Sequence, residues 1–343
     1  MLAYWIFALV VASLAYALWN GGFTGGVTVA GTQIGEGSPM EELPEQILAG
    51  GPRVPVFEGD RMEVKLQIKS RHGTRGPARV YGSVAGTELS VAAGRVPREG
   101  WAERRVLGPL RRGPVEVQGM AIERGDPLGF FRHRMSGQDS ELALVLPRFR
   151  SLAERLTVRE LEASIAAPRA GSGNEMFGVR EYRPGDPLRR IHWRSSARHG
   201  ELIVREFEPP GVQTLGIFCD PSPPSDEAAD QIARLAASEA WDCLRAGGRV
   251  VLWAPGAEPS QPSESRSIWA LLEWLARYPA GEGEWGPPPV GDAIAVVATA
   301  NPEIDDAIEG IRQRGGSVRA WVVGKNEVDF DMPMQRAGLA WPL

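Results

Sequence analysis

Apolar and polar side chains alternate strictly near residue 60, where Met62, Val64, Leu66 and Ile68 are separated by charged or amide side chains. This period of two predicts a strand with one buried face and one solvated face. Similar short runs follow, punctuated by glycine and proline, at residues 78–84, 88–91, 115–122 and 142–146. Several short strands at this spacing predict a β-sandwich over residues 53–148.

The pattern changes after Pro147, and a helical run at 152–165 and a glycine-rich loop at 168–178 lead into a new region. Apolar strands and helical stripes then alternate, with strands expected at 212–219, 249–254, 293–298 and 318–323, and helices expected after Ser225, at 268–278 and at 302–314. Apolar strands that alternate with helices predict a Rossmann-like parallel sheet covered on both faces. We assign this α/β domain to residues 149–343.

The first segment, Met1–Trp19, has no charged side chain. About 18 to 20 apolar residues suffice to cross a bilayer, so the pattern predicts a transmembrane anchor at residues 1–20 followed by a linker at 21–52. A cleaved signal peptide is the alternative, with Ala15-Tyr16-Ala17 as its cleavage site, but the usual positive n-region is missing. The chain is thus expected at the cell membrane.

The composition and the missing motifs argue against several classes of protein. The formal net charge of -5 argues against a nucleic-acid binder that depends on phosphate contacts. Two cysteines, Cys219 and Cys243, cannot form a disulfide framework or a zinc site. The sequence contains no P-loop motif, and no glycine fingerprint for dinucleotides follows Cys219. We therefore expect no cofactor.

The densest group of charged side chains lies in residues 181–208, EYRPGDPLRRIHWRSSARHGELIVREFE. Pro184-Gly185 predicts a turn, Asp186 is a good N-cap before Pro187, and Gly200 ends the helix. Three interpretations stay open for this stretch: a structural arginine–carboxylate network, a partner-binding surface, and catalysis. Catalysis would pair His192 with Ser195 or Ser196, and no third orienting group is evident.

This stretch closely resembles the signature of the domain-of-unknown-function-58 family. The resemblance extends upstream to Arg111-Arg112-Gly113 and to Asp126-Pro127-Leu128-Gly129-Phe130. It implies a multidomain protein with an N-terminal membrane helix, a β-sandwich and a von Willebrand A-like α/β domain, which often accompanies MoxR-type AAA+ ATPases. The matched residues assigned to partner binding are Arg180, Glu181, Tyr182, Asp186, Arg189, His192, Trp193, Arg198, Arg205 and Glu206.

A second motif, Asp220-Pro221-Ser222-Pro223-Pro224, follows the strand that ends at Cys219. Von Willebrand A domains bind a divalent cation here through D-x-S-x-S, and in this chain Asp220 and Ser222 match while Pro224 replaces the last serine. The loop at 298–301 lacks the aspartate that a metal site would need. We interpret Asp220 and Ser222 as a degenerate, unoccupied metal site, in which Asp220 caps local N–H groups.

These observations predict a membrane-anchored, non-enzymatic scaffold or adaptor that binds protein partners and works with a MoxR-type AAA+ ATPase. Because such an ATPase is intracellular, the soluble domains are expected on the cytoplasmic face. The alternatives are a divalent-metal-dependent ligand-binding domain at Asp220 and a hydrolase that uses His192 and a serine.

Overall fold

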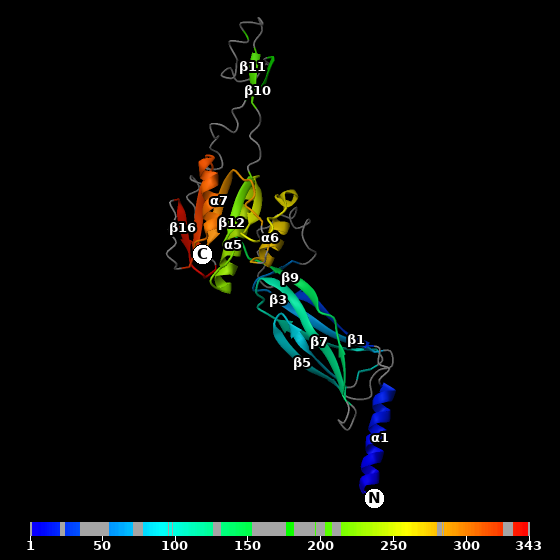
Figure 1. Ribbon diagram of the computed structural model, residues 1–343. Coiled ribbons are helices and arrows are strands. Elements are labelled where there is room, and N and C mark those ends of the chain that lie inside the picture. Colours follow the sequence, from blue (N-terminus) through cyan, green and yellow to red (C-terminus); the bar gives the residue numbers. More distant parts are fainter. Residues whose placement is uncertain are drawn as a thin grey trace. The chain divides into compact units, whose positions relative to one another are not determined.

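A computed structural model describes residues 2–20, 25–34, 55–70, 78–94, 96–97, 99–125, 132–152, 176–181, 196, 203–207, 214–279, 283, 285–324 and 332–341. The chain divides into two compact units (Figure 1). Unit 1 comprises Met1–Arg148 and Leu272–Ala280, and unit 2 comprises Phe149–Leu271 and Gly281–Leu343. The helix at 153–165 and the motif at 126–130, both predicted from the sequence, lie outside the described residues.

Residues 2–20 form helix α1 (Leu2–Asn20), so a helix is present where the sequence predicts one. The prediction that this helix crosses a membrane is wrong. Within the described parts of the chain, no helix combines the length and the apolar character that a membrane span requires.

Unit 1 is built from two β-sheets. The first has the order β1-β3-β6, and the second has the order β2-β9-β7-β4-β5 with β8 paired to β7. The strands are β1 (Gly25–Ile34), β2 (Val56–Phe57), β3 (Arg61–Ser70), β4 (Ala78–Val84), β5 (Thr87–Gly94), β6 (Trp101–Leu107), β7 (Gly113–Gly125), β8 (Arg132–Ser136) and β9 (Ser140–Leu146). Strand β1 lies inside the stretch that the sequence assigned to a linker.

The core of unit 1 confirms the alternation seen in the sequence. Met62, Val64, Leu66 and Ile68 of β3 are all buried, and they pack in one cluster with side chains of the second sheet. The hairpin between β4 and β5 turns through Ala85 and Gly86, both with positive φ, as a two-residue loop of the primed type requires.

Unit 2 contains a five-stranded parallel sheet of order β13-β12-β14-β15-β16 and a separate antiparallel ribbon, β10-β11. The elements are β10 (Met176–Glu181), β11 (Ile203–Phe207), β12 (Thr214–Cys219), α5 (Asp226–Arg245), β13 (Arg249–Trp253), η3 (Pro262–Glu264), α6 (Ile268–Arg277), β14 (Asp292–Val297), α7 (Pro302–Gln313), β15 (Val318–Val323) and β16 (Met334–Ala337). The last part of α6, from Leu272, clusters with unit 1.

Helices α5 and α7 cover opposite faces of the parallel sheet (Figure 1). Glu239 of α5 bonds to Arg319 and Trp321 of β15, whereas Ala320 between them packs in a cluster with Ile308 and neighbouring side chains of α7. Successive side chains of a strand point to opposite faces, so the two helices must lie on different sides. The predicted parallel sheet with two covered faces is therefore present.

Candidate functional site at the carboxyl ends of the sheet

Asp220 directly follows β12 and is completely buried. One carboxylate oxygen accepts a hydrogen bond from Ser222 N at 2.9 Å. The other accepts from Ala298 N at 3.0 Å, from Thr299 N at 2.7 Å and from Thr299 Oγ1 at 2.7 Å. The carboxylate of Asp220 thus joins the loop after β12 to the loop after β14.

These two loops begin at the point of the sheet where open α/β folds bind ligands. Strands β12 and β14 are neighbours, and the loops that follow them lead to α5 and α7 on opposite faces. Such a reversal creates a crevice at the carboxyl ends of the strands, which is where ligands of these sheets are found. We call the two loops with their helix starts, residues 221–227 and 298–303, the strand-end surface.

The helix starts on the strand-end surface are capped by side chains. Ser225 accepts a hydrogen bond from Ala228 N at 3.2 Å. Asn301 accepts from Glu303 N at 3.0 Å and from Ile304 N at 3.2 Å, and Pro302 occupies the first turn. Caps of this kind satisfy amides that have no partner within the helix, so both loops enter their helices in fixed conformations.

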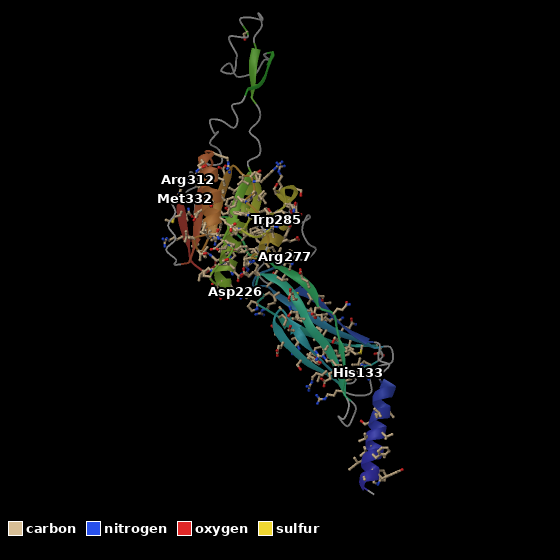
Figure 2. All side chains as sticks on the ribbon, viewed as in Figure 1. His133, Asp226, Arg277, Trp285, Arg312 and Met332 are labelled. Carbon is tan, nitrogen blue, oxygen red and sulfur yellow. The ribbon has the colours of Figure 1, made fainter. Side chains whose placement is uncertain are left out.

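Acidic side chains follow both caps and are exposed, namely Asp226, Glu227, Glu303, Asp305 and Asp306. Negative charge in a first turn is stabilised by the helix dipole. Burial raises the pKa of Asp305, and the negative charge of Asp306 raises it further. In Figure 2, Asp226 at the start of α5 and Arg312 near the end of α7 lie at opposite ends of unit 2. This is expected, because α5 begins where the parallel strands end and α7 ends where they begin.

The residues around Asp220 do not fit a divalent cation. Hard cations need several free oxygen ligands, but both Asp220 oxygens accept hydrogen bonds and the Thr299 hydroxyl donates to Asp220. Pro224 supplies no hydroxyl where the cation motif has serine. Among the described residues, no group of three or more histidine, cysteine, aspartate or glutamate side chains could hold a metal.

A buried charge fixes α5 to the sheet. Glu239 is 1% exposed, and its carboxylate accepts hydrogen bonds at 2.6 Å from Arg319 Nη2 and at 2.6 Å from Trp321 Nε1. Burial raises the pKa of Glu239, although the charge of Arg319 and the hydrogen bond from Trp321 act in the opposite direction. The sequence reasoning missed this pair. A carboxylate inside an apolar stripe was the signal that could have revealed the pair.

The same helix holds the segment that leads into the signature. Asp242 accepts hydrogen bonds from Ser151 Oγ at 2.7 Å and from Leu152 N at 2.8 Å. The rings of Phe149 and Trp241 lie 5.6 Å apart. Asp242 lies near the end of α5, which faces the edge where the strands begin, and β12 also begins at this edge with Thr214. Leu152 and Thr214 therefore both lie at the edge opposite the strand-end surface.

The described residues include only part of the signature. Arg180, Glu181, Arg205 and Glu206 belong to the β10-β11 ribbon, where Arg180 pairs with Val204 and Arg205 pairs with Val179. Ser196 is a buried helical residue. The other residues proposed from the sequence lie outside the described residues, namely Tyr182, Asp186, Arg189, His192, Trp193 and Arg198.

The upstream motif Arg111-Arg112-Gly113 has a structural contact in unit 1. Arg112 Nη1 donates hydrogen bonds to the carbonyl oxygens of Leu275 and Tyr278, and its guanidinium lies 5.7 Å from the Tyr278 ring centroid. These carbonyls end α6, where a cation is favoured by the helix dipole. An ion pair between Arg277 and Glu141, at 2.9 Å, joins the same turn to β9.

Comparison with known proteins places the signature in a family. Residues 178–284 match the family described as "Protein of unknown function DUF58". This DUF58 match confirms the resemblance seen in the sequence, and it covers β12, α5 and β13 but ends before β14. The Asp220 side of the strand-end surface is therefore inside the match, and the Thr299 side is outside it.

Two individual proteins are also similar. The "Uncharacterized protein YeaD" of Bacillus subtilis (strain 168) is 24% identical over 243 residues, which cover 66% of this chain and 59% of YeaD. The chain thus spans about three fifths of that relative. The crystal structure of the "Putative ApaA Protein" from Bordetella pertussis matches 36% of this chain and 94% of its own at 12% identity, and its TM-score of 0.22 carries no argument.

Proposed function

We propose that this chain is a non-enzymatic adaptor that binds a protein partner through the strand-end surface. The observation that carries the proposal is the set of hydrogen bonds that the Asp220 carboxylate accepts from both loops. These bonds hold two exposed loops in one arrangement before any partner arrives. A preorganised surface loses less conformational entropy on binding than a loose one. The buried carboxylate therefore acts on the arrangement of the surface and does not contact the partner.

The charge of the strand-end surface indicates the chemistry of the partner. Glu227 and Glu303 are exposed in the first turns of α5 and α7 and lie next to other acidic side chains. Complementary charge accelerates association and excludes partners of the same sign. The partner should therefore present lysine or arginine side chains to this edge of unit 2.

An AAA+ ATPase of the MoxR type is our candidate partner, because proteins of the family that the signature resembles often accompany such ATPases. On the same basis we propose that unit 2 is a von Willebrand A-like domain, a proposal with which its parallel sheet is compatible. Since AAA+ ATPases act inside the cell, the proposal places both units there.

The test uses the full-length chain and a purified MoxR-type ATPase from the same organism. We expect the two proteins to bind in surface plasmon resonance. Replacing Glu227 and Glu303 together with glutamine should slow association several-fold at low salt and weaken the salt dependence. Glu264→Gln is the matched control, because Glu264 is an exposed acid of unit 2 and precedes Ser265, whose carbonyl oxygen accepts a hydrogen bond from Val250 N at the start of β13, the opposite end of the strands. Absence of binding, or equal rates for the double variant and the control, would refute the proposal.

A further inference from the structure

A proline-rich stretch of unit 2, Trp285-Gly286-Pro287-Pro288-Pro289, connects the end of α6 with β14 and takes no part in the strand-end surface. Proline fixes its own φ, and a residue that precedes proline is restricted to extended or polyproline II conformations. Gly286, Pro287 and Pro288 each precede a proline. The stretch is therefore held in an extended, polyproline II-like path by its covalent structure.

Both ends of this stretch are fixed to the unit. The carbonyl oxygen of Trp285 accepts a hydrogen bond at 3.1 Å from Nε1 of the completely buried Trp253. Just before it, Gly283 N donates to Gly256 O at 2.7 Å. At the other end, Val290 is buried in the cluster that contains Phe218 and Trp253. The prolines thus bridge two anchored points.

The side chains between these anchors face solvent. Pro287 and Pro289 are exposed, and the side chain of Trp285 is half exposed (Figure 2). A Cβ atom on Gly283 would lie 2.6 Å from the Trp285 ring, so the indole packs closely against the glycine. Within the described part of this stretch, no hydrogen bond engages the carbonyl oxygens of residues 286–289.

We propose that residues 285–289 are a preformed ligand for a partner module that reads polyproline II segments through a groove lined with aromatic rings. Such grooves accept successive prolines between their rings, and a segment that is already extended costs little entropy to bind. Trp285 adds a large, half-exposed ring at one end, of the kind that dominates binding at protein interfaces. This site is separate from the proposed contact with the ATPase.

The probes are purified SH3, WW and EVH1 domains, which all read proline-rich segments in this way. Isothermal titration with the full-length chain should show saturable binding of at least one of them. Pro287→Ala combined with Pro289→Ala should weaken that binding about tenfold or more. Pro97→Ala is the matched control, because Pro97 is an exposed proline of unit 1 with no proline beside it.

Trp285→Ala gives a second, independent variant and should also weaken binding. Failure of all three domains to bind at about 1 mM, a level near the weakest measurable affinity, would overturn the proposal. Equal affinities for wild type, the proline double variant and Trp285→Ala would overturn it as well. Because the ATPase contact is measured separately, either proposal can fail while the other stands.

Discussion

At the scale of single residues, Asp220 determines how the loops after β12 and β14 are held. Replacement by alanine removes the acceptor of three backbone amides and one hydroxyl in a buried position. We expect Asp220→Ala to lower the free energy of unfolding of unit 2 by about 3 to 5 kcal/mol. Thr299→Val removes one donor only and should cost about 1 kcal/mol. Urea unfolding measures both, and a loss for Asp220→Ala no larger than that for Thr299→Val would contradict the assignment.

Cys243 is expected to be an unreactive thiol. Burial raises the pKa of Cys243 to about 11, and the nearby charge of Glu239 adds to the shift. Because of this raised pKa, the thiolate fraction of Cys243 at pH 8 is roughly a hundredfold lower than that of a free cysteine. The thiolate is the form that reacts, so the thiol of Cys243 should react slowly. Iodoacetamide labelling of the native chain, followed by peptide mass spectrometry, should be slow at Cys243 and fast after denaturation. Rapid native labelling would show that the thiol is accessible and ionised.

At the scale of elements, the link between α5 and β15 depends on Glu239. Glu239→Ala leaves Arg319 without its partner and Trp321 Nε1 without an acceptor, and should cost about 3 to 5 kcal/mol. Glu239→Gln keeps an acceptor for Trp321 and should cost less. Chemical denaturation of unit 2 compares them, and equal losses for the two variants would show that the hydrogen bond to Trp321 contributes little.

The pH dependence of this link follows from the direction of its pKa shift. Because the folded-state pKa of Glu239 is raised above 4.5, the folded chain binds this proton more tightly than the unfolded chain. This proton-dependent part of the stability is therefore fully present below pH 4.5, and it is lost as the pH rises through the folded-state pKa. Glu239→Gln should remove this part of the pH profile of stability, and an unchanged profile would contradict the shift.

The last turn of α6 depends on Arg112 in a similar way. Arg112→Ala leaves the terminal carbonyl oxygens of this helix without their cation and should destabilise unit 1 by about 1.5 to 3 kcal/mol. Arg79 of β4 is an exposed arginine of the same unit, so Arg79→Ala should stay within about 0.5 kcal/mol of wild type. Thermal unfolding of both variants tests this, and equal melting temperatures would argue against a role for the hydrogen bonds of Arg112.

At the scale of the whole molecule, stability should not depend on divalent cations. The oxygens around Asp220 already serve hydrogen bonds between the loops, so a cation would have to displace them. A ligand that binds only the folded state raises the melting temperature with its concentration. We expect equal melting temperatures in EDTA and in Mg²⁺, Mn²⁺ or Ca²⁺, measured by calorimetry. A rise with one cation that disappears in Asp220→Ala would reinstate a metal site.

The sequence predicts the parts of this molecule that depend on local pattern. Alternation identifies β3, and an apolar run that ends in aspartate identifies the end of β12. The predicted linker missed β1, because a glycine-rich strand has little alternation to detect. Glu239 bonds to Trp321, which lies 82 positions later in the sequence, and Arg112 bonds to Leu275, which lies 163 positions later. Contacts at such separations depend on tertiary structure, and no local pattern encodes them.

The position of Leu152 and Thr214 at one end of unit 2 has a mechanical consequence. A pulling force on the chain between these two residues reaches α5 through Leu152 and the parallel sheet through Thr214. It is then resisted by the hydrogen bonds of Asp242 and by the pairing of β12 with β13 and β14. A partner that gripped this part of the chain would load β12, which lies between β13 and β14, directly. Asp220 follows the other end of that strand, away from the point of loading.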